Sequence, residues 1–205
     1  MAKFVKNNSG VVRINFIIDE SGSMLGQKTN VINGFNEFVQ EQKKQPGKTF
    51  LTLTKFNSSA GVVYSGVDIN EVPELNVFTY TPGGMTALND AIGNTILAED
   101  KFAKGCKVLF VVMTDGQENA SRKFKSANQI KSMIKEKEAE GNWTFVFMGA
   151  DMDAQRESEQ YGIGTANTMS YNSAETFSTM KQMSDATIRY RSSADGQTMD
   201  FFNKD

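Results

Sequence analysis

The chain has 205 residues, of which 39% are hydrophobic and 10% aromatic. This is enough apolar material for the core of one medium-sized domain, and the length leaves little room for a second. The formal net charge is −2, and basic residues are scattered among acidic ones, so a broad basic face for phosphate backbones is not expected and nucleic acid is a poor candidate partner. We expect a single domain over residues 1–205, with its core at about 11–191.

Sequence features that report on compartment agree with one another. Residues 1–10 are polar, and no later stretch reaches the roughly 20 apolar residues that cross a bilayer. The lone cysteine, Cys106, has no partner in the chain for a disulfide, which fits a reducing compartment, although a virion or an exported protein is compatible with it. We therefore expect a cytoplasmic protein that does not bind a membrane.

The first predicted elements are a strand and a helix joined by a polar loop. Residues 11–18 are apolar, interrupted mainly by an arginine and an asparagine, as expected of a strand covered on both faces. After the loop, apolar residues between 31 and 39 recur at helical spacing until Pro46 and Gly47 end the run. The order is therefore strand, loop, helix.

A hairpin follows. Residues 49–56 and 61–67 alternate with period two on either side of the turn-forming Asn57-Ser58-Ser59. One strand here should be antiparallel to its neighbours.

The rest of the chain again alternates helix and strand. This order implies right-handed crossovers and a three-layer, doubly wound α/β fold: a mostly parallel sheet with one antiparallel edge strand and helices on both faces. Ligands bind such sheets at the carboxyl ends of the central strands, where the loops after Ile18 and Met113 should meet. We expect helices at about 87–102, 126–139, 154–160 and 173–191, and strands at 107–113, 142–148 and 166–170.

Three loops carry oxygen-bearing side chains to that edge. DESGS at 19–23 offers, at alternate positions, the carboxylate of Asp19 and two hydroxyls around a glycine that permits a tight turn, TDG at 114–116 offers a second carboxylate, and PGGMT at 82–86 offers a third hydroxyl. With neither imidazole nor clustered thiolate, this set suits Mg²⁺, and also Mn²⁺ or Ca²⁺, better than Zn²⁺ or Cu²⁺. The candidate metal ligands are Asp19, Ser21, Ser23, Thr86 and Asp115.

These residues resemble a known motif. Asp19, Ser21 and Ser23 are similar to the DxSxS element of the metal-ion-dependent adhesion site in von Willebrand factor A and integrin I domains, and Thr86 and Asp115 match its distal threonine and aspartate. The resemblance extends over nearly the whole chain. It implies that the serines and, in the ligand-competent state, the threonine bind the metal directly, while the aspartates act largely through water.

The resemblance also implies a function. Neutral hydroxyls leave the cation incompletely neutralised, so it stays avid for an Asp or Glu side chain supplied by a protein partner. One departure from the family pattern is Met85, an extra residue between the glycine pair and Thr86.

Structural roles compete for some of these residues. Asp19, Ser21 and Ser23 could form a helix amino-terminal cap, and Thr86 could cap a helix that begins at Ala87. The first alternative does not explain why Thr86 arrives at the same edge of the sheet.

Other polar residues near the site are expected to be structural or solvated. We interpret Glu20 and Glu118 as solvated rim residues rather than ligands. Asp151 and Asp153 fit a turn and a cap before a short helix better than a second cation site.

Several apolar residues are left with open roles. Met24 and Met85 adjoin the predicted metal-binding loops and could line a ligand platform. Phe201 and Phe202 either fold back on the core or serve as a docking peptide.

The leading hypothesis is a non-enzymatic, metal-dependent protein-binding module. The alternatives are an adaptor for an AAA+ ATPase or for a stress-response complex of the tellurium-resistance kind, a viral structural or host-interaction protein, and a metal-dependent hydrolase. Against the hydrolase, the chain has no histidine for acid-base work and no GxxxxGK[ST] phosphate loop. The oligomeric state is not readable from the sequence.

Overall fold

A computed structural model describes residues 10–202, so residues 1–9 and 203–205 of the predicted domain lie outside the described part. Six strands form one sheet in the order β3-β2-β1-β4-β5-β6. Their bounds are Val12–Asp19 for β1, Thr49–Phe56 for β2, Ala60–Asp68 for β3, Lys107–Thr114 for β4, Trp143–Ala150 for β5 and Thr168–Tyr171 for β6.

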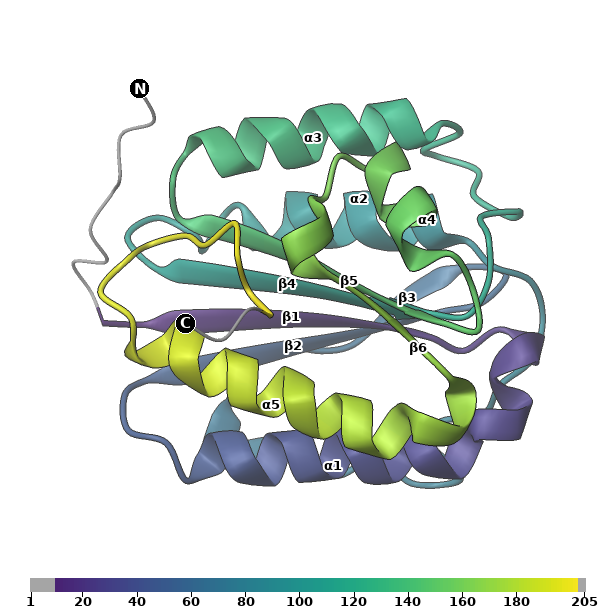
Figure 1. The fold of residues 1–205 in the computed structure, drawn as a ribbon, viewed down its shortest axis with the longest axis horizontal. Helices are drawn as coiled ribbons and strands as arrows, with labels where there is room; N and C mark the ends of the chain where they lie inside the picture. The colour runs from purple at the N-terminus through teal and green to yellow at the C-terminus, as the bar shows by residue number, and fades with distance from the viewer. Residues whose placement is uncertain (1–9, 203–205) are drawn as a thin grey trace.

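Helices cover both faces of the sheet, so the molecule has three layers (Figure 1). One face carries α1 (Lys28–Lys43) and α5 (Thr176–Ser192). The other carries α2 (Leu88–Glu99), α3 (Ala127–Ala139) and α4 (Ala154–Gln160). Short 3₁₀ helices join them: η1 Gly22–Gln27, η2 Ile69–Glu71, η3 Thr165–Asn167 and η4 Ser173–Glu175.

Strand direction confirms the predicted fold class. All neighbouring pairs are parallel except β2 and β3, which form the predicted hairpin with β3 at the edge. The central strand β4 is buried along its whole length, as its unbroken apolar sequence requires between two helical layers. The parallel pairing of β1 with β4, with Ile18 opposite Met113, places the carboxyl ends of the two strands side by side at one edge of the sheet.

Aromatic side chains pack in pairs on both faces of the sheet. On the α1 face, Phe16 of β1 meets Phe35 and Phe38 of α1 edge-on, with ring centroids 5.5 and 5.3 Å apart. On the opposite face, Phe110 of β4 packs against Phe145 of β5 at 5.1 Å. Such pairs add about 0.5–1.5 kcal/mol each beyond the area they bury.

Element ends depart from the sequence predictions by a few residues. α2 ends at Glu99 rather than near residue 102, because the chain turns at 100–102 and Phe102 is exposed. β6 begins at Thr168 rather than at 166, since Thr165–Asn167 forms η3. Apolar periodicity marks the middle of an element well and its ends poorly.

The carboxyl-terminal segment folds back on the core. Phe201 is buried, its ring centroid lies 6.0 Å from that of Tyr190 in α5, and its backbone N–H donates to Asn167 Oδ1 at 2.8 Å. Phe201 therefore folds back on the core and does not serve as a free docking peptide. Among residues 10–202, no helix is both long and apolar enough to cross a bilayer.

Candidate metal centre

The first carboxylate lies between the ends of the two central strands. Asp19 is the last residue of β1 and is fully buried. Its Oδ1 accepts the Ser21 backbone N–H at 2.7 Å, and its Oδ2 accepts the Thr114 hydroxyl, from the end of β4, at 2.5 Å. Burial raises the pKa of Asp19 to about 6, although the Thr114 and Ser21 hydrogen bonds oppose the rise.

The two serines link Asp19 to the second carboxylate. Ser21 Oγ and Ser23 Oγ are 3.0 Å apart, and the Ser23 hydroxyl donates to Asp115 Oδ1 at 2.5 Å. Gln27 Nε2 donates to Asp115 Oδ2 at 3.0 Å. The loops after β1 and β4 therefore meet, as predicted, in one hydrogen-bonded network.

Thr86 arrives from a third loop and completes the group. An added Cβ on Gly116 would lie 3.4 Å from Thr86 Oγ1 and 3.8 Å from Ser23 Oγ, so both hydroxyls border the same small space. Thr86 is held there by Asn119: the Thr86 N–H donates to Asn119 Oδ1 at 2.8 Å and the Asn119 N–H donates to Thr86 O at 3.0 Å. All five predicted ligands are thus brought together.

The glycine loop that carries Thr86 is also tied to the β1 loop. Gly22 N–H donates to Gly84 O at 3.1 Å, and Gly83 N–H donates to Glu20 O at 2.9 Å. Gly84 has a φ of 81°, which a side chain would strain, and an added Cβ would lie 2.7 Å from Ser58 Oγ. The inserted Met85 is accommodated because its N–H donates to Ser58 Oγ at 3.1 Å.

The carboxylates of Asp19 and Asp115 favour the binding of a cation. Among residues 10–202, neither Asp19 nor Asp115 forms an ion pair with a lysine or arginine, yet Asp19 is fully buried. A buried, unpaired carboxylate is costly unless an opposite charge compensates it. In the described part of the chain no group of three or more His, Cys, Asp or Glu side chains could hold a metal, so an ion here would depend on hydroxyl ligands as well. Carboxylate and hydroxyl oxygens fit a hard divalent cation.

The helix-cap alternatives do not account for these residues. Ser21 stands at the N-cap position of η1, but its hydroxyl pairs with Ser23 instead of a backbone N–H. α2 begins at Leu88 with Ala87 as its N-cap, so Thr86 lies before the cap.

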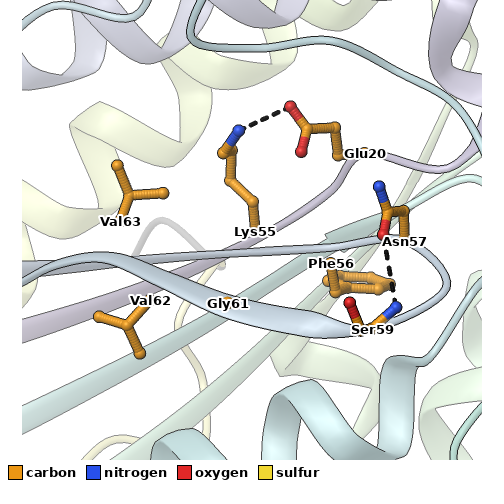
Figure 2. A pocket seen from close by; sticks show the side chains of 8 residues that line it. All are labelled: Glu20, Lys55, Phe56, Asn57, Ser59, Gly61, Val62 and Val63. Carbon is orange, nitrogen blue, oxygen red and sulfur yellow. Dashed lines mark hydrogen bonds and ion pairs between the residues drawn. The ribbon is translucent and has the colours of Figure 1, made fainter.

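Glu20 is not the solvated rim residue that the sequence suggested. Its side chain is buried in an ion pair with Lys55 at 2.7 Å and also accepts the Thr81 N–H at 2.6 Å. The pair borders an open hollow of about 300 Å³ that exposed Val62 and Val63 of β3 also line (Figure 2). Glu20 therefore fixes the shape of the loop beside the candidate centre.

Glu118 is likewise structural rather than solvated. Its carboxylate accepts the N–H groups of Asn89, Ala120 and Ser121 and the Ser121 hydroxyl, at 2.7–2.8 Å. These bonds tie the loop after β4 to the first turn of α2.

The predictions for Asp151 and Asp153 are confirmed, whereas the one for Met24 is wrong. Asp153 caps α4 by accepting the Arg156 N–H, and Asp151, with φ 52°, accepts the Ser173 N–H, so both have the predicted turn and cap roles. Met24 is fully buried in the α1-side core, so the prediction that it could line a ligand platform is wrong. Met85 is exposed at the loop as that prediction requires.

Sequence reasoning missed several residues that support the group. Thr114 and Gln27 bond the two carboxylates, and Tyr80, from the 72–87 connection, donates its hydroxyl to Asp19 O at 2.6 Å. Gln27 Oε1 in turn accepts the Thr176 hydroxyl of α5 at 3.1 Å. The position of Thr114 just before Asp115 at a strand end could have indicated its role, whereas Gln27 and Tyr80 carry no local signal.

Comparison with known families matches residues 14–188 to the von Willebrand factor type A domain. The chain belongs to this family. No curated protein matches it. Solved structures show the same fold at low sequence identity. Proximal thread matrix protein 1 from the mussel byssus, described with a zinc-occupied metal-ion-dependent adhesion site, is 18% identical with a TM-score of 0.66, over 90% of this chain and 47% of that one.

Two further structures illustrate the range of the fold. A von Willebrand factor type A protein from Catenulispora acidiphila is 18% identical with a TM-score of 0.63, over 86% of this chain and 42% of that one. The von Willebrand factor domain of the type V pili tip protein Mfa5 from Porphyromonas gingivalis is 11% identical with a TM-score of 0.66, over 87% of this chain and 95% of that one. This chain therefore spans less than half of the mussel and Catenulispora chains.

Proposed function

We propose that this von Willebrand factor A domain is a non-enzymatic module that binds one divalent cation and, through it, an Asp or Glu side chain of a protein partner. The observation that carries the proposal is the meeting of three separate loops around a buried carboxylate that no basic side chain among residues 10–202 neutralises. The proposed metal ligands are Asp19, Ser21, Ser23, Thr86 and Asp115.

Each ligand has a role that follows from its hydrogen bonds. Thr114 and the Ser21 N–H orient Asp19, and Gln27 orients Asp115, so both carboxylates are fixed before a metal arrives. Ser23 donates its proton to Asp115 and so keeps oxygen lone pairs for a cation. A cation bound here would supply a Lewis-acidic charge that the neutral hydroxyls only partly offset, which favours a carboxylate from outside.

The native ion is proposed to be Mg²⁺, with Mn²⁺ or Ca²⁺ as alternatives, because every donor is an oxygen. The mussel protein is described with zinc in its adhesion site, so the comparable site of that protein accepts a softer metal. Zn²⁺ therefore belongs in any comparison of metals.

A hydrolytic function has weaker support in the same geometry. The Ser21 hydroxyl is paired with Ser23, and the chain has no histidine to remove its proton. Burial raises the pKa of Tyr80 well above its ordinary value, so its hydroxyl remains a donor to Asp19 O.

The biological setting is proposed from chemistry alone. We place the protein in the cytoplasm. As an adaptor beside an AAA+ ATPase or stress-response complex, or as a component of a virus particle, it would use the same metal-bridged contact. The similar solved structures include a pilus adhesin, SpaC from Lactobacillus rhamnosus GG, which supports a binding rather than a catalytic role.

The direct test is Mn²⁺ binding by isothermal titration calorimetry. Wild-type protein should bind one Mn²⁺, and Ser21→Ala with Ser23→Ala should abolish the binding heat. The matched control is Ser132→Ala with Ser178→Ala, two exposed helix serines whose hydroxyls bond only local carbonyls. Unchanged Mn²⁺ binding in the first double variant would refute the proposed site.

A further inference from the structure

Several exposed apolar side chains lie on segments that carry or adjoin the candidate metal ligands. Leu25, two residues after Ser23 in η1, is 65% exposed, and Met85, directly before Thr86, is 52% exposed. Val77 and Phe78, in the connection that leads to Tyr80, are 54% and 89% exposed. Four large apolar side chains thus stand on η1, on the loop that carries Thr86 and on the connection that Tyr80 joins to Asp19.

The segment that carries Phe78 is a tightly bonded turn. Asn76 Oδ1 accepts the N–H groups of Phe78 and Thr79 at 2.9 and 3.1 Å. Thr79 Oγ1 accepts the Asn76 N–H at 2.8 Å, and Asn76 O accepts the Tyr80 N–H at 3.0 Å. The turn is therefore held in one shape with Val77 and Phe78 at its tip.

The same turn is fastened to the end of β1 through Tyr80 and to the start of α1 through Val77. Tyr80 is fully buried and bonds Asp19 O, while Lys28 Nζ donates to Val77 O at 2.9 Å. Lys55 Nζ donates to Thr79 O at 2.7 Å, and the same amine pairs with Glu20 in the hollow of Figure 2. The position of Phe78 relative to the candidate centre is therefore set by the fold.

Folding alone does not explain this arrangement. A phenylalanine left 89% exposed contributes little hydrophobic stabilisation, yet the hydrogen bonds of the turn and of Lys28 and Lys55 define its position. Exposed apolar patches of this kind mark contact surfaces, and aromatic side chains supply much of the binding energy there.

We propose that Leu25, Val77, Phe78 and Met85 form an apolar platform, which receives apolar side chains that flank the metal-binding Asp or Glu of a protein partner. The inference rests on the proposed function, and it adds the chemistry of the partner: an acidic residue with large aliphatic or aromatic neighbours. The acidic group would bind the cation while its neighbours cover the platform.

The charge distribution favours a protein segment over a membrane. Anionic lipid surfaces attract free lysines and arginines. Here the Lys28 and Lys55 amines already bond carbonyls of the turn, Lys55 also neutralises Glu20, and the whole chain carries a net charge of −2. An uncharged platform beside a cation complements an acidic residue in an apolar context.

The test uses a displayed library of dodecapeptides with a fixed central glutamate and random flanks, selected on the full chain in Mg²⁺. Enriched peptides should carry large apolar residues beside the glutamate and lose binding in EDTA. Leu25→Ser with Phe78→Ser should weaken the binding of a synthetic enriched peptide at least about tenfold, equivalent to about 1.4 kcal/mol. Leu97→Ser with Phe102→Ser, the matched control pair on exposed residues outside the platform, should leave it unchanged.

The experiments distinguish a failure of the platform from a failure of the metal site. Enriched peptides without apolar flanks, no enrichment at all, or equal binding by both double variants would overturn the platform even if Mn²⁺ binds normally by calorimetry. Absence of Mn²⁺ binding would instead refute the metal site. If no peptide is selected and the protein instead binds vesicles of phosphatidylcholine and phosphatidylserine in a Phe78-dependent way, the platform would belong to a membrane contact. If it instead self-associates through Phe78 in sedimentation, the platform would belong to a second copy. Either result would overturn the proposal.

Discussion

Replacing Asp19 by asparagine separates the cost of the buried charge from the benefit of the metal. Asp19 is fully buried and its pKa is raised from 3.8 to about 6, mainly by desolvation. Asparagine keeps the acceptor for the Ser21 N–H, and its amide can donate to Thr114 Oγ1, which still donates to Gly116 O. The substitution should therefore remove a charge without leaving a buried polar atom unbonded.

The sign of the effect follows from proton linkage. Because the folded-state pKa of Asp19 lies above its unfolded value, the protonated form is favoured in the folded protein, and that stability is lost as pH rises through about 6. At pH 7.5 the metal-free protein bears the full cost of the charge. The change in pKa corresponds to about 3 kcal/mol at most.

The assay is thermal unfolding at pH 7.5 in EDTA and in Mg²⁺. In EDTA, Asp19→Asn should melt up to roughly 6–12 °C above the wild type, since 1 kcal/mol is about 2–4 °C for a domain of this size. Mg²⁺ at about 100 times its Kd should stabilise the wild type by about 2.7 kcal/mol and leave Asp19→Asn unchanged. The matched control is Asp185→Asn, an exposed aspartate of α5, which should follow the wild type in both conditions.

Two results would refute this reasoning. An Asp19→Asn protein that melts below the wild type in EDTA would mean that the buried charge is not a cost. A variant that keeps the wild-type response to Mg²⁺ would place the cation elsewhere.

Three further predictions concern the supports of the site and the sheet. Asn119→Ala should weaken Mn²⁺ binding about tenfold in calorimetry, because the Asn119 side chain accepts the Thr86 N–H, and alanine keeps only the backbone bond from the Asn119 N–H to Thr86 O. Glu99→Ala should lower the free energy of unfolding in urea by about 3–5 kcal/mol, because it leaves Arg13 as an unpaired, largely buried charge. Burial lowers the pKa of Lys107 to about 8 in the folded protein. Between pH 8 and about 10.5 the unfolded chain therefore binds more protons than the folded chain does. The stability of the wild type relative to Lys107→Met should rise with pH over that interval.

A different result would contradict each of these three predictions. An unchanged Mn²⁺ affinity in Asn119→Ala would show that the Thr86 loop is positioned without it. A loss below about 1 kcal/mol in Glu99→Ala would give the Arg13 pair the small value of a surface ion pair. Parallel pH profiles for Lys107→Met and the wild type would show that the Lys107 amine is solvated in the folded state.

Sequence patterns predicted the fold because they are repeated along whole elements. The unbroken apolar run of β4 and the helical spacing in α1 leave few alternatives for layer and direction. The candidate ligands were found for a similar reason: each follows or precedes an element whose place in the sheet was clear. Their joint geometry then followed from the parallel order of β1 and β4.

Residues outside such patterns were harder to interpret. Glu20 follows a buried strand and resembles a solvated loop residue, but Lys55, 35 positions later, neutralises it. Met24 adjoins the metal loop, yet the 3₁₀ turn of η1 directs it into the core. The bond from Thr176 to Gln27 joins residues 149 positions apart. Contacts of this kind depend on tertiary placement, which local sequence does not encode.

The most direct test of the metal centre is a crystal of the protein soaked in Mn²⁺, with anomalous difference density calculated at the manganese edge. The account predicts a single strong peak among the oxygens of Ser21, Ser23 and Thr86, with Asp19 and Asp115 beside it. Well-ordered side chains with no anomalous peak among them, or a peak elsewhere on the domain, would contradict it.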